Sequence, residues 1–175
     1  MTVRALLFAL LFVLPQPAAA AEAVAVDISW EYRNFAAAVE LYEAEGRPRL
    51  WETKSVKTLA DAPVVGLIDD SSFALAPGRR KRFVLVVRNE TAAPLHFFAA
   101  PHVVDPVEHS LGFKFKCLCI NHAFTVGPGE VWYRVVELRL SRGHVGDALT
   151  VTHSIIGIDG ERAAAFSKPP GPPDF

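Results

Sequence analysis

The chain has 175 residues, of which 51% are hydrophobic and 21% charged, so a packed globular domain is expected. Its formal net charge is -1 and its longest basic run is the cluster Arg79–Arg82, which excludes the electrostatic footprint of a nucleic-acid-binding protein. That cluster precedes an apolar run and is expected to be solvated at a sheet edge. A contact with a membrane surface or an acidic partner is the alternative.

The N-terminus has the pattern of a secretory signal peptide. The positive residue Arg4 precedes the apolar core Ala5–Leu14, which two prolines end before the small-residue run Ala18–Ala21. This core is shorter than the roughly 20 apolar residues that a membrane-spanning helix needs. We therefore predict that residues 1–21 are a cleaved leader and that the mature protein acts in the periplasm. An uncleaved membrane anchor is the alternative.

Residues 22–72 are predicted to form an N-terminal extension that packs on the core. Within it, Asp27–Glu45 has apolar residues three to four positions apart and Gly46 as a stop, which indicates a short helix. A strand followed by a shorter helix fits the same pattern. Beyond this segment, short strands are expected around Leu50–Trp51 and Val64–Ile68.

Residues 73–160 are predicted to fold as a β-sandwich. Five segments are rich in β-branched and aromatic residues and are separated by turn residues. They are Lys81–Arg88, Leu95–Ala99, Gly112–Ile120, Val131–Leu140 and Ala148–Ile158. Short strands at this spacing indicate an all-β fold, an immunoglobulin-like or cupredoxin-like sandwich. Residues 161–175 are predicted to be a proline-rich tail, of which Lys168–Phe175 is expected to be disordered.

The predicted strand Gly112–Ile120 carries the candidate metal ligands. Alternate side chains of a strand share a face, so Phe113, Phe115, Cys117 and Cys119 are expected to project together. Two thiolates select soft ions such as Cu(I) or Zn(II). Structural zinc takes four protein ligands, and the sequence shows no obvious histidine pair near the cysteines. Cu(I) is therefore the favoured ion.

A disulfide between Cys117 and Cys119, which one residue separates, would be strained and easily reduced, so a structural staple is a poor explanation of the pair. The interpretation that stays open is that Cys117 and Cys119 are small buried hydrophobes, a common fate of free cysteine. Export weighs against that interpretation, because unprotected thiols outside the cytoplasm are prone to oxidation.

Three runs of the chain carry a family resemblance: Ala100–Pro106 (APHVVDP), Leu111–Ile120 (LGFKFKCLCI) and Val126–Glu130 (VGPGE). Together they resemble the core of the CtaG-type copper-insertion proteins, which deliver copper to the CuB site of cytochrome c oxidase. The resemblance covers roughly Leu75 to Ile158. It implies an immunoglobulin-like fold, Cu(I) held by the two cysteines and a copper-bridged homodimer.

The chain also departs from that family. Leu118 and Ile120 stand where the family motif has phenylalanines, and Asp27–Asp70 has no counterpart. The leader is shorter than the family's transmembrane anchor, and the family's additional cysteine near the anchor is missing. We therefore predict an exported copper chaperone with a copper donor or acceptor protein as partner. Delivery to a membrane-bound oxidase is implied by the resemblance alone.

The six histidines are further candidate ligands, because imidazole binds copper in either oxidation state. His122 follows the cysteines closely and is the first candidate. His144 lies in a glycine-flanked turn and is expected to be solvated. The others are ranked lower, and they are His96, His102, His109 and His153.

Other classes of protein fit the sequence less well. A blue-copper electron carrier needs one Cys, two His and usually a Met, and the only methionine is Met1. A thiol oxidoreductase usually places its reactive thiol at a helix N-terminus. A copper-free assembly module fits if the cysteines are core residues. The sequence shows no carboxylate pair, nucleophile elbow or glycine-rich phosphate loop, so an enzyme is not predicted.

The leader yields the first testable prediction. If it is cleaved, the intact mass of the protein recovered from the periplasmic fraction corresponds to a chain that begins near Ala21–Val24, because the small-residue run provides the cleavage site. Recovery of the full-length chain from membranes alone would contradict the prediction and support the anchor.

Overall fold

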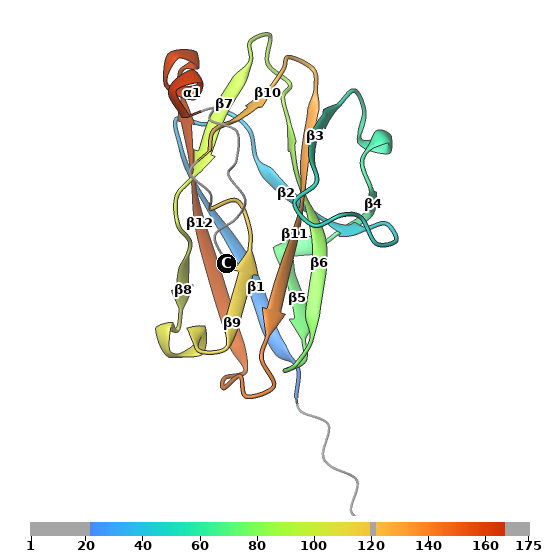
Figure 1. Ribbon diagram of the computed structural model, residues 1–175, viewed down its shortest axis with the longest axis vertical. Helices are drawn as coiled ribbons and strands as arrows, with labels where there is room; N and C mark the ends of the chain where they lie inside the picture. Colours follow the sequence, from blue (N-terminus) through green and yellow to red (C-terminus); the bar gives the residue numbers. More distant parts are fainter. Residues whose placement is uncertain (1–21, 120–121, 167–175) are drawn as a thin grey trace, which may run out of the picture.

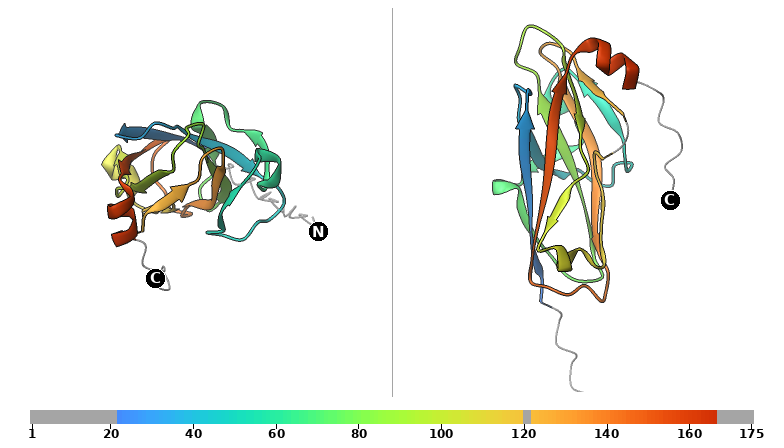
Figure 2. Two further views of the ribbon diagram at one scale, coloured as in Figure 1. Left: turned by 90° about the horizontal axis from the view of Figure 1, so that it is seen from above. Right: turned by 90° about the vertical axis from the view of Figure 1, so that its left-hand side faces the viewer.

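The computed structural model describes residues 22–119 and 122–166, which form two facing β-sheets. The strands run mostly along the long axis of the molecule (Figure 1). Viewed from the side, the last strand extends over most of the molecule and leads into a short C-terminal helix (Figure 2). The predicted all-β sandwich is confirmed.

The first sheet has the order β10–β7–β12–β1–β5, and β8 also pairs with β12. Its strands are β1 (Val24–Arg33), β5 (Ser72–Leu75), β7 (Leu95–Ala99), β8 (Val103–Asp105), β10 (Phe124–Val126) and β12 (Ala148–Ile158). The second sheet has the order β3–β11–β6–β2–β4, and β9 also pairs with β11. Its strands are β2 (Val39–Ala44), β3 (Thr53–Val56), β4 (Val64–Leu67), β6 (Arg80–Arg88), β9 (Phe113–Lys116) and β11 (Val131–Leu140).

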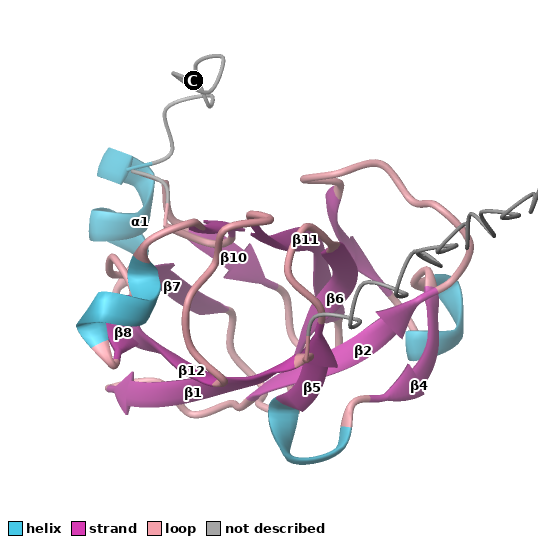
Figure 3. Ribbon diagram, turned by 90° about the horizontal axis from the view of Figure 1, so that it is seen from below, coloured by secondary structure: helices cyan, strands magenta, loops and turns pink. Residues whose placement is uncertain are grey.

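The helical segments are short and lie at the periphery of the sheets (Figure 3). They are η1 (Leu59–Asp61), η2 (Asp69–Ser71), η3 (Val107–Ser110) and α1 (Gly160–Phe166). Within residues 22–119 and 122–166, none of the helices has the length and apolar character that crossing a bilayer requires.

Strand β6 shows how the sequence builds the two sides of the second sheet. Phe83, Leu85 and Val87 face the main core between the sheets. Val84 and Val86 point the other way, into a smaller apolar cluster that residues between β3 and β4 help to cover. Because both faces are covered, the strand carries an unbroken apolar run rather than an alternating one.

The N-terminal region differs from the prediction. The short helix expected within Asp27–Glu45 is wrong, because β1 and β2 occupy that segment. In β1, the buried residues Val24, Val26 and Ile28 alternate with more exposed residues, as expected of a strand with one face in the core. This strand lies between β12 and β5. Residues 22–72 therefore supply strands to both sheets, whereas the sequence suggested an extension packed on the core.

The predicted strands of the second half agree more closely. Four of the five have bounds within one residue of β6, β7, β11 and β12, and the exception is the cysteine strand discussed below. The strand expected at Leu50–Trp51 is a turn, and β3 begins two residues later. The predicted leader, residues 1–21, and residues 167–175 of the predicted tail lie outside the described residues. The assignment of residues 161–166 to the tail is wrong, because they belong to α1, in which Ala163 is buried.

The close approach of β12 to the end of β1 yields a stability prediction. A Cβ added at Gly157 would collide with the backbone carbonyl of Asn34. Gly157→Ala should therefore lower the free energy of unfolding by roughly 1–3 kcal/mol in urea denaturation, as overpacking does. Gly66→Ala is the matched control, because nothing lies within 4 Å of a Cβ at that position in β4. Equal losses in both variants would contradict the prediction.

Candidate metal centre

His153 lies in the middle of β12, on the face that points into the sandwich. Its neighbours on that face, Val151 and Ile155, are fully buried, and so is the histidine itself, at 0% exposure. The imidazole packs against the rings of Trp30 and Phe115, with centroids 5.1 and 5.4 Å away. Neither ring nitrogen has a hydrogen-bond partner at ordinary hydrogen-bond distance among the described residues, although Cys117 lies close enough for the imidazole to lower the pKa of its thiol. An unsatisfied buried polar group lowers the stability of the folded protein by about 1–3 kcal/mol. A ligand bound to the imidazole of His153 would remove this penalty.

A bulge in the first sheet brings His102 beside His153. The register of β12 shifts by one residue between β7 and β8, so that the three residues Ala100–His102 face the two residues His153 and Ser154. An extra residue of this kind bends its strand, and Pro101, which has no N–H to donate, suits the interruption. The two imidazole rings lie 5.2 Å apart between centroids.

The cysteine pair reaches the same point from the second sheet. β9 pairs with one edge of β11 as far as Lys116. Beyond that point, the segment that leads into β3 already bonds to the same edge of β11. The N–H of Trp51 donates to the carbonyl of Val135, and the N–H of Val135 donates to the carbonyl of Glu52. The segment entering β3 thus takes the place that a longer β9 would need. The chain leaves the sheet and bends at Cys117.

The predicted strand Gly112–Ile120 is therefore wrong at Cys117–Cys119, and Ile120 lies outside the described residues. Cys117 and Cys119 lie on a bend, whereas the sequence placed them at alternate positions of one pleated strand. The bend still brings them together, with free thiols whose Sγ atoms are 2.9 Å apart. The N–H of Cys119 donates to the Sγ of Cys117 at 3.4 Å.

Two thiols and two imidazoles converge as a result. Nδ1 of His102 lies 3.3 Å from the Sγ of Cys119 and 3.5 Å from the Sγ of Cys117. One ligand atom from each of these residues and from His153 lies within 4.8 Å of all the others. A four-coordinate ion with bonds of about 2.0–2.3 Å holds its ligands roughly 3.5 Å apart. Small side-chain rotations would therefore let one ion contact all four.

The protonation of the two thiols is coupled through their contact. The hydrogen bond with Cys119 holds the pKa of Cys117 far below its usual range against the effect of burial, and His102 and His153 add to this lowering. The same bond, together with burial, raises the pKa of Cys119. At neutral pH the metal-free pair therefore holds one proton, which a bound metal ion displaces.

The histidine ranking changes with the structure. His122, the first candidate, is outside the cluster, and its ring packs against Phe124 at 5.3 Å between centroids. His144 is buried, so the expectation that it is solvated is wrong. His102 and His153 join the cysteines, so the argument that no histidine pair lies near them is also wrong. Alternation along β12 could have identified His153 as an inward residue.

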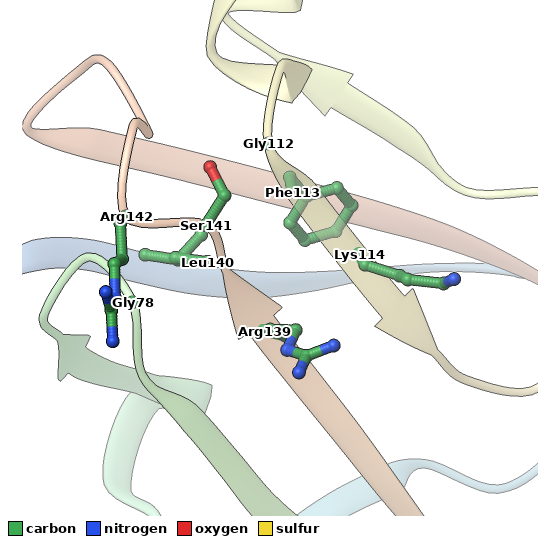
Figure 4. A pocket seen from close by; sticks show the side chains of 8 residues that line it. All are labelled: Gly78, Gly112, Phe113, Lys114, Arg139, Leu140, Ser141 and Arg142. Carbon is green, nitrogen blue, oxygen red and sulfur yellow. The ribbon is translucent and has the colours of Figure 1, made fainter.

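A surface depression of about 530 Å³ lies apart from these ligands, and none of the four lines it. Three cationic side chains, Lys114, Arg139 and Arg142, contribute to its walls (Figure 4). Phe113 also borders the depression, and its ring packs edge-on against His102 at 5.7 Å between centroids. This depression is therefore a basic surface feature, separate from the thiol chemistry.

The sandwich and its four converging ligands define a β-protein with a candidate centre for a soft or borderline metal ion. Residues 24–158 match the sequence profile of a family described as a domain of unknown function, DUF8709. The chain belongs to this family. No curated protein matches the sequence.

The buried imidazole of His153 gives a prediction that distinguishes a packing role of this residue from a role as a metal ligand. His153→Leu should leave the metal-free protein as stable as wild type or more stable, because an apolar side chain of similar size removes an unsatisfied buried group. The same variant should lose the rise in melting temperature that Cu(I) or Zn(II) produces in wild type, since binding to the folded state stabilises it. Differential scanning fluorimetry measures both effects.

His96→Leu is the matched control for this experiment. His96 lies in β7 and its Nδ1 contacts the hydroxyl of Thr125, outside the cluster. The control should keep the full metal-dependent rise. A His153→Leu protein that is severely destabilised without metal, or that is stabilised by metal as much as wild type, would refute a ligand role for His153.

Proposed function

We propose that the protein is an exported chaperone for Cu(I), which is its cargo. Cys117 and Cys119 bind the ion, and His102 and His153 complete the site. The observation that carries this proposal is the convergence of two thiols on two imidazoles, one of which is buried without a hydrogen-bond partner in the part of the chain that the structure describes. Thiolates select Cu(I) over hard cations, and imidazole is a common additional ligand.

The unequal burial of the four ligands supports transfer rather than permanent storage. Cys117 and His153 are buried, whereas Cys119 and His102 are half-buried. An incoming thiolate from an acceptor protein can replace the two half-buried ligands first, while the buried ligands still hold the ion. The aromatic rings of Phe113 and Phe115 beside His102 limit the access of water to the same place.

A structural zinc site is the second candidate, and the Cys₂His₂ ligand set favours it. One observation weighs against it. The ligands lie beside an extensive apolar core, so folding does not depend on a metal as it does in small zinc domains.

An electron carrier is the third candidate, because His102, His153 and Cys117 supply the His₂Cys set of blue-copper sites. The second thiol, Cys119, distinguishes this cluster from such a site, since it adds a soft ligand that favours Cu(I). An intense visible absorption band after addition of Cu(II), stable in air, would support the electron carrier.

The destination of the copper rests on sequence patterns. The predicted leader supports export to the periplasm, and the resemblance to the CtaG-type proteins suggests the CuB site of a membrane-bound oxidase as the client. The copper-bridged homodimer implied by that resemblance would use the half-buried side of the cluster, Cys119 and His102, in two chains. Such a two-fold contact is the commonest symmetry of homo-oligomers.

Cu(I) titration of the reduced protein under anaerobic conditions, against a competing chelator, tests the proposal. Wild type should bind about one ion per chain. Cys117→Ser and Cys119→Ser should each weaken binding by at least about a hundredfold, because one remaining thiolate competes poorly with a chelator. Binding that survives the loss of both cysteines would refute the proposal.

Two further measurements complete this experiment. Ser110→Ala, which changes a hydroxyl outside the cluster, is a control that should bind as wild type does. Light scattering with and without Cu(I) tests the bridge: a doubled mass supports the homodimer, and an unchanged mass with tight binding supports a site completed within one chain.

A further inference from the structure

Arg134 is an unusual residue for the interior of a β-sandwich. It lies in β11 between Trp132 and Val136, which face the main core, and it is 6% exposed. Its NH1 donates to the hydroxyl of Thr53 at 2.7 Å. Its guanidinium also lies over the ring of Phe124, 5.6 Å from the ring centroid. These contacts hold the cation between the sheets.

The buried cation has too few partners of its own. Among residues 22–119 and 122–166, no carboxylate forms an ion pair with Arg134, and its Nε has no hydrogen-bond partner. Burial lowers the pKa of Arg134 to about 10, so the side chain is cationic at neutral pH. The strand register brings this cation near the metal centre. Lys116, the residue before Cys117, pairs with Glu137, three positions along β11 from Arg134, and Cys117 packs in the same core cluster as Trp132 and Val136.

This arrangement matters because buried charges interact strongly. A charge in the interior is costly unless an opposite charge compensates it, and the cysteine pair supplies that compensation here. The net charge of the centre, and hence its interaction with Arg134, depends on which ion is bound.

We propose that Arg134 is a specificity-determining residue, whose buried positive charge favours Cu(I) over Zn(II) at the cluster of His102, Cys117, Cys119 and His153. This inference rests on the proposed function. Two thiolates and neutral imidazoles form a complex of net charge -1 with Cu(I) and of net charge zero with Zn(II). The guanidinium attracts the anionic complex and does not attract the neutral one.

The ratio of the two affinities isolates this effect. Both ions start from the same metal-free protein, so the cost of opening the site and of displacing its proton cancels in the ratio. One unit of charge at an effective dielectric constant of about 20 changes such a ratio by roughly tenfold or more over the separations found within one protein core. A purely structural role of Arg134 would instead weaken the binding of both ions together.

The experiment measures the Cu(I) and Zn(II) affinities of the purified full chain by competition with a chromogenic Cu(I) chelator and a fluorescent Zn(II) chelator. Arg134→Gln and Arg134→Met remove the charge, and the glutamine can still donate to Thr53. Arg134→Lys keeps the charge. Arg139→Met, at an exposed position of the same strand, removes a positive charge outside the core. Melting temperatures without metal identify variants that fold.

The expected result is a Cu(I)-to-Zn(II) affinity ratio at least about tenfold lower in the charge-removing variants than in wild type. Arg134→Lys and Arg139→Met should retain the wild-type ratio. An unchanged ratio in Arg134→Gln, or equal losses for both ions, would overturn the role of Arg134 while leaving the chaperone proposal intact. Failure of wild type to bind Cu(I) would overturn both. If the methionine variant does not fold, the glutamine variant provides the test.

Discussion

The imidazole of His153 imposes the constraint on which the candidate centre depends. Strand β12 is the long strand of the first sheet, and its inward positions are otherwise apolar. A histidine at one of these positions, with neither nitrogen bonded among the described residues, destabilises the fold unless something binds it. The other ligands gather around this residue: His102 through a bulge, and the two thiols through a bend that enters from the opposite sheet.

Competition for one strand edge explains how the thiols reach that point. β9 and the segment leading into β3 share the same edge of β11, and β9 must end where the other segment begins. The cysteines therefore lie where the chain turns inward, close to both histidines. A bend also leaves one side of the pair half-buried, which gives an acceptor protein access to the ion. The bend that ends β9 therefore both positions the thiols and leaves them accessible to an acceptor protein.

Much of the fold could be predicted from local patterns. The strands β6, β7, β11 and β12 are rich in β-branched and aromatic residues and are bounded by turn residues, and their predicted bounds agree with the structure to within one residue. The N-terminal helix was wrong because the apolar spacing in Asp27–Glu45 fits two periods, and pairing with β12 and β6 favours the strands. Pairing with neighbouring strands determines that this segment is extended, and the local spacing of apolar residues does not encode that pairing.

The candidate site was less accessible to sequence reasoning. The cysteines could be recognised by their chemistry, but the end of β9 depends on a competitor from residues 51–52, which are distant in the chain. His102 is placed by a register shift, for which a single sequence gives no signal. Arg134 would have been assigned to a solvent-facing position on charge alone. Each of these residues acquires its role from contacts between elements far apart in sequence.

X-ray absorption spectroscopy at the copper edge, on reduced protein loaded with one equivalent of Cu(I), tests the central claim most directly. The account predicts an edge typical of Cu(I), with two sulfur ligands and at least one imidazole nitrogen per copper, and loss of the imidazole signal in the absence of His102 and His153. A copper environment of oxygen and nitrogen alone, or one unchanged by removal of both cysteines, would contradict it.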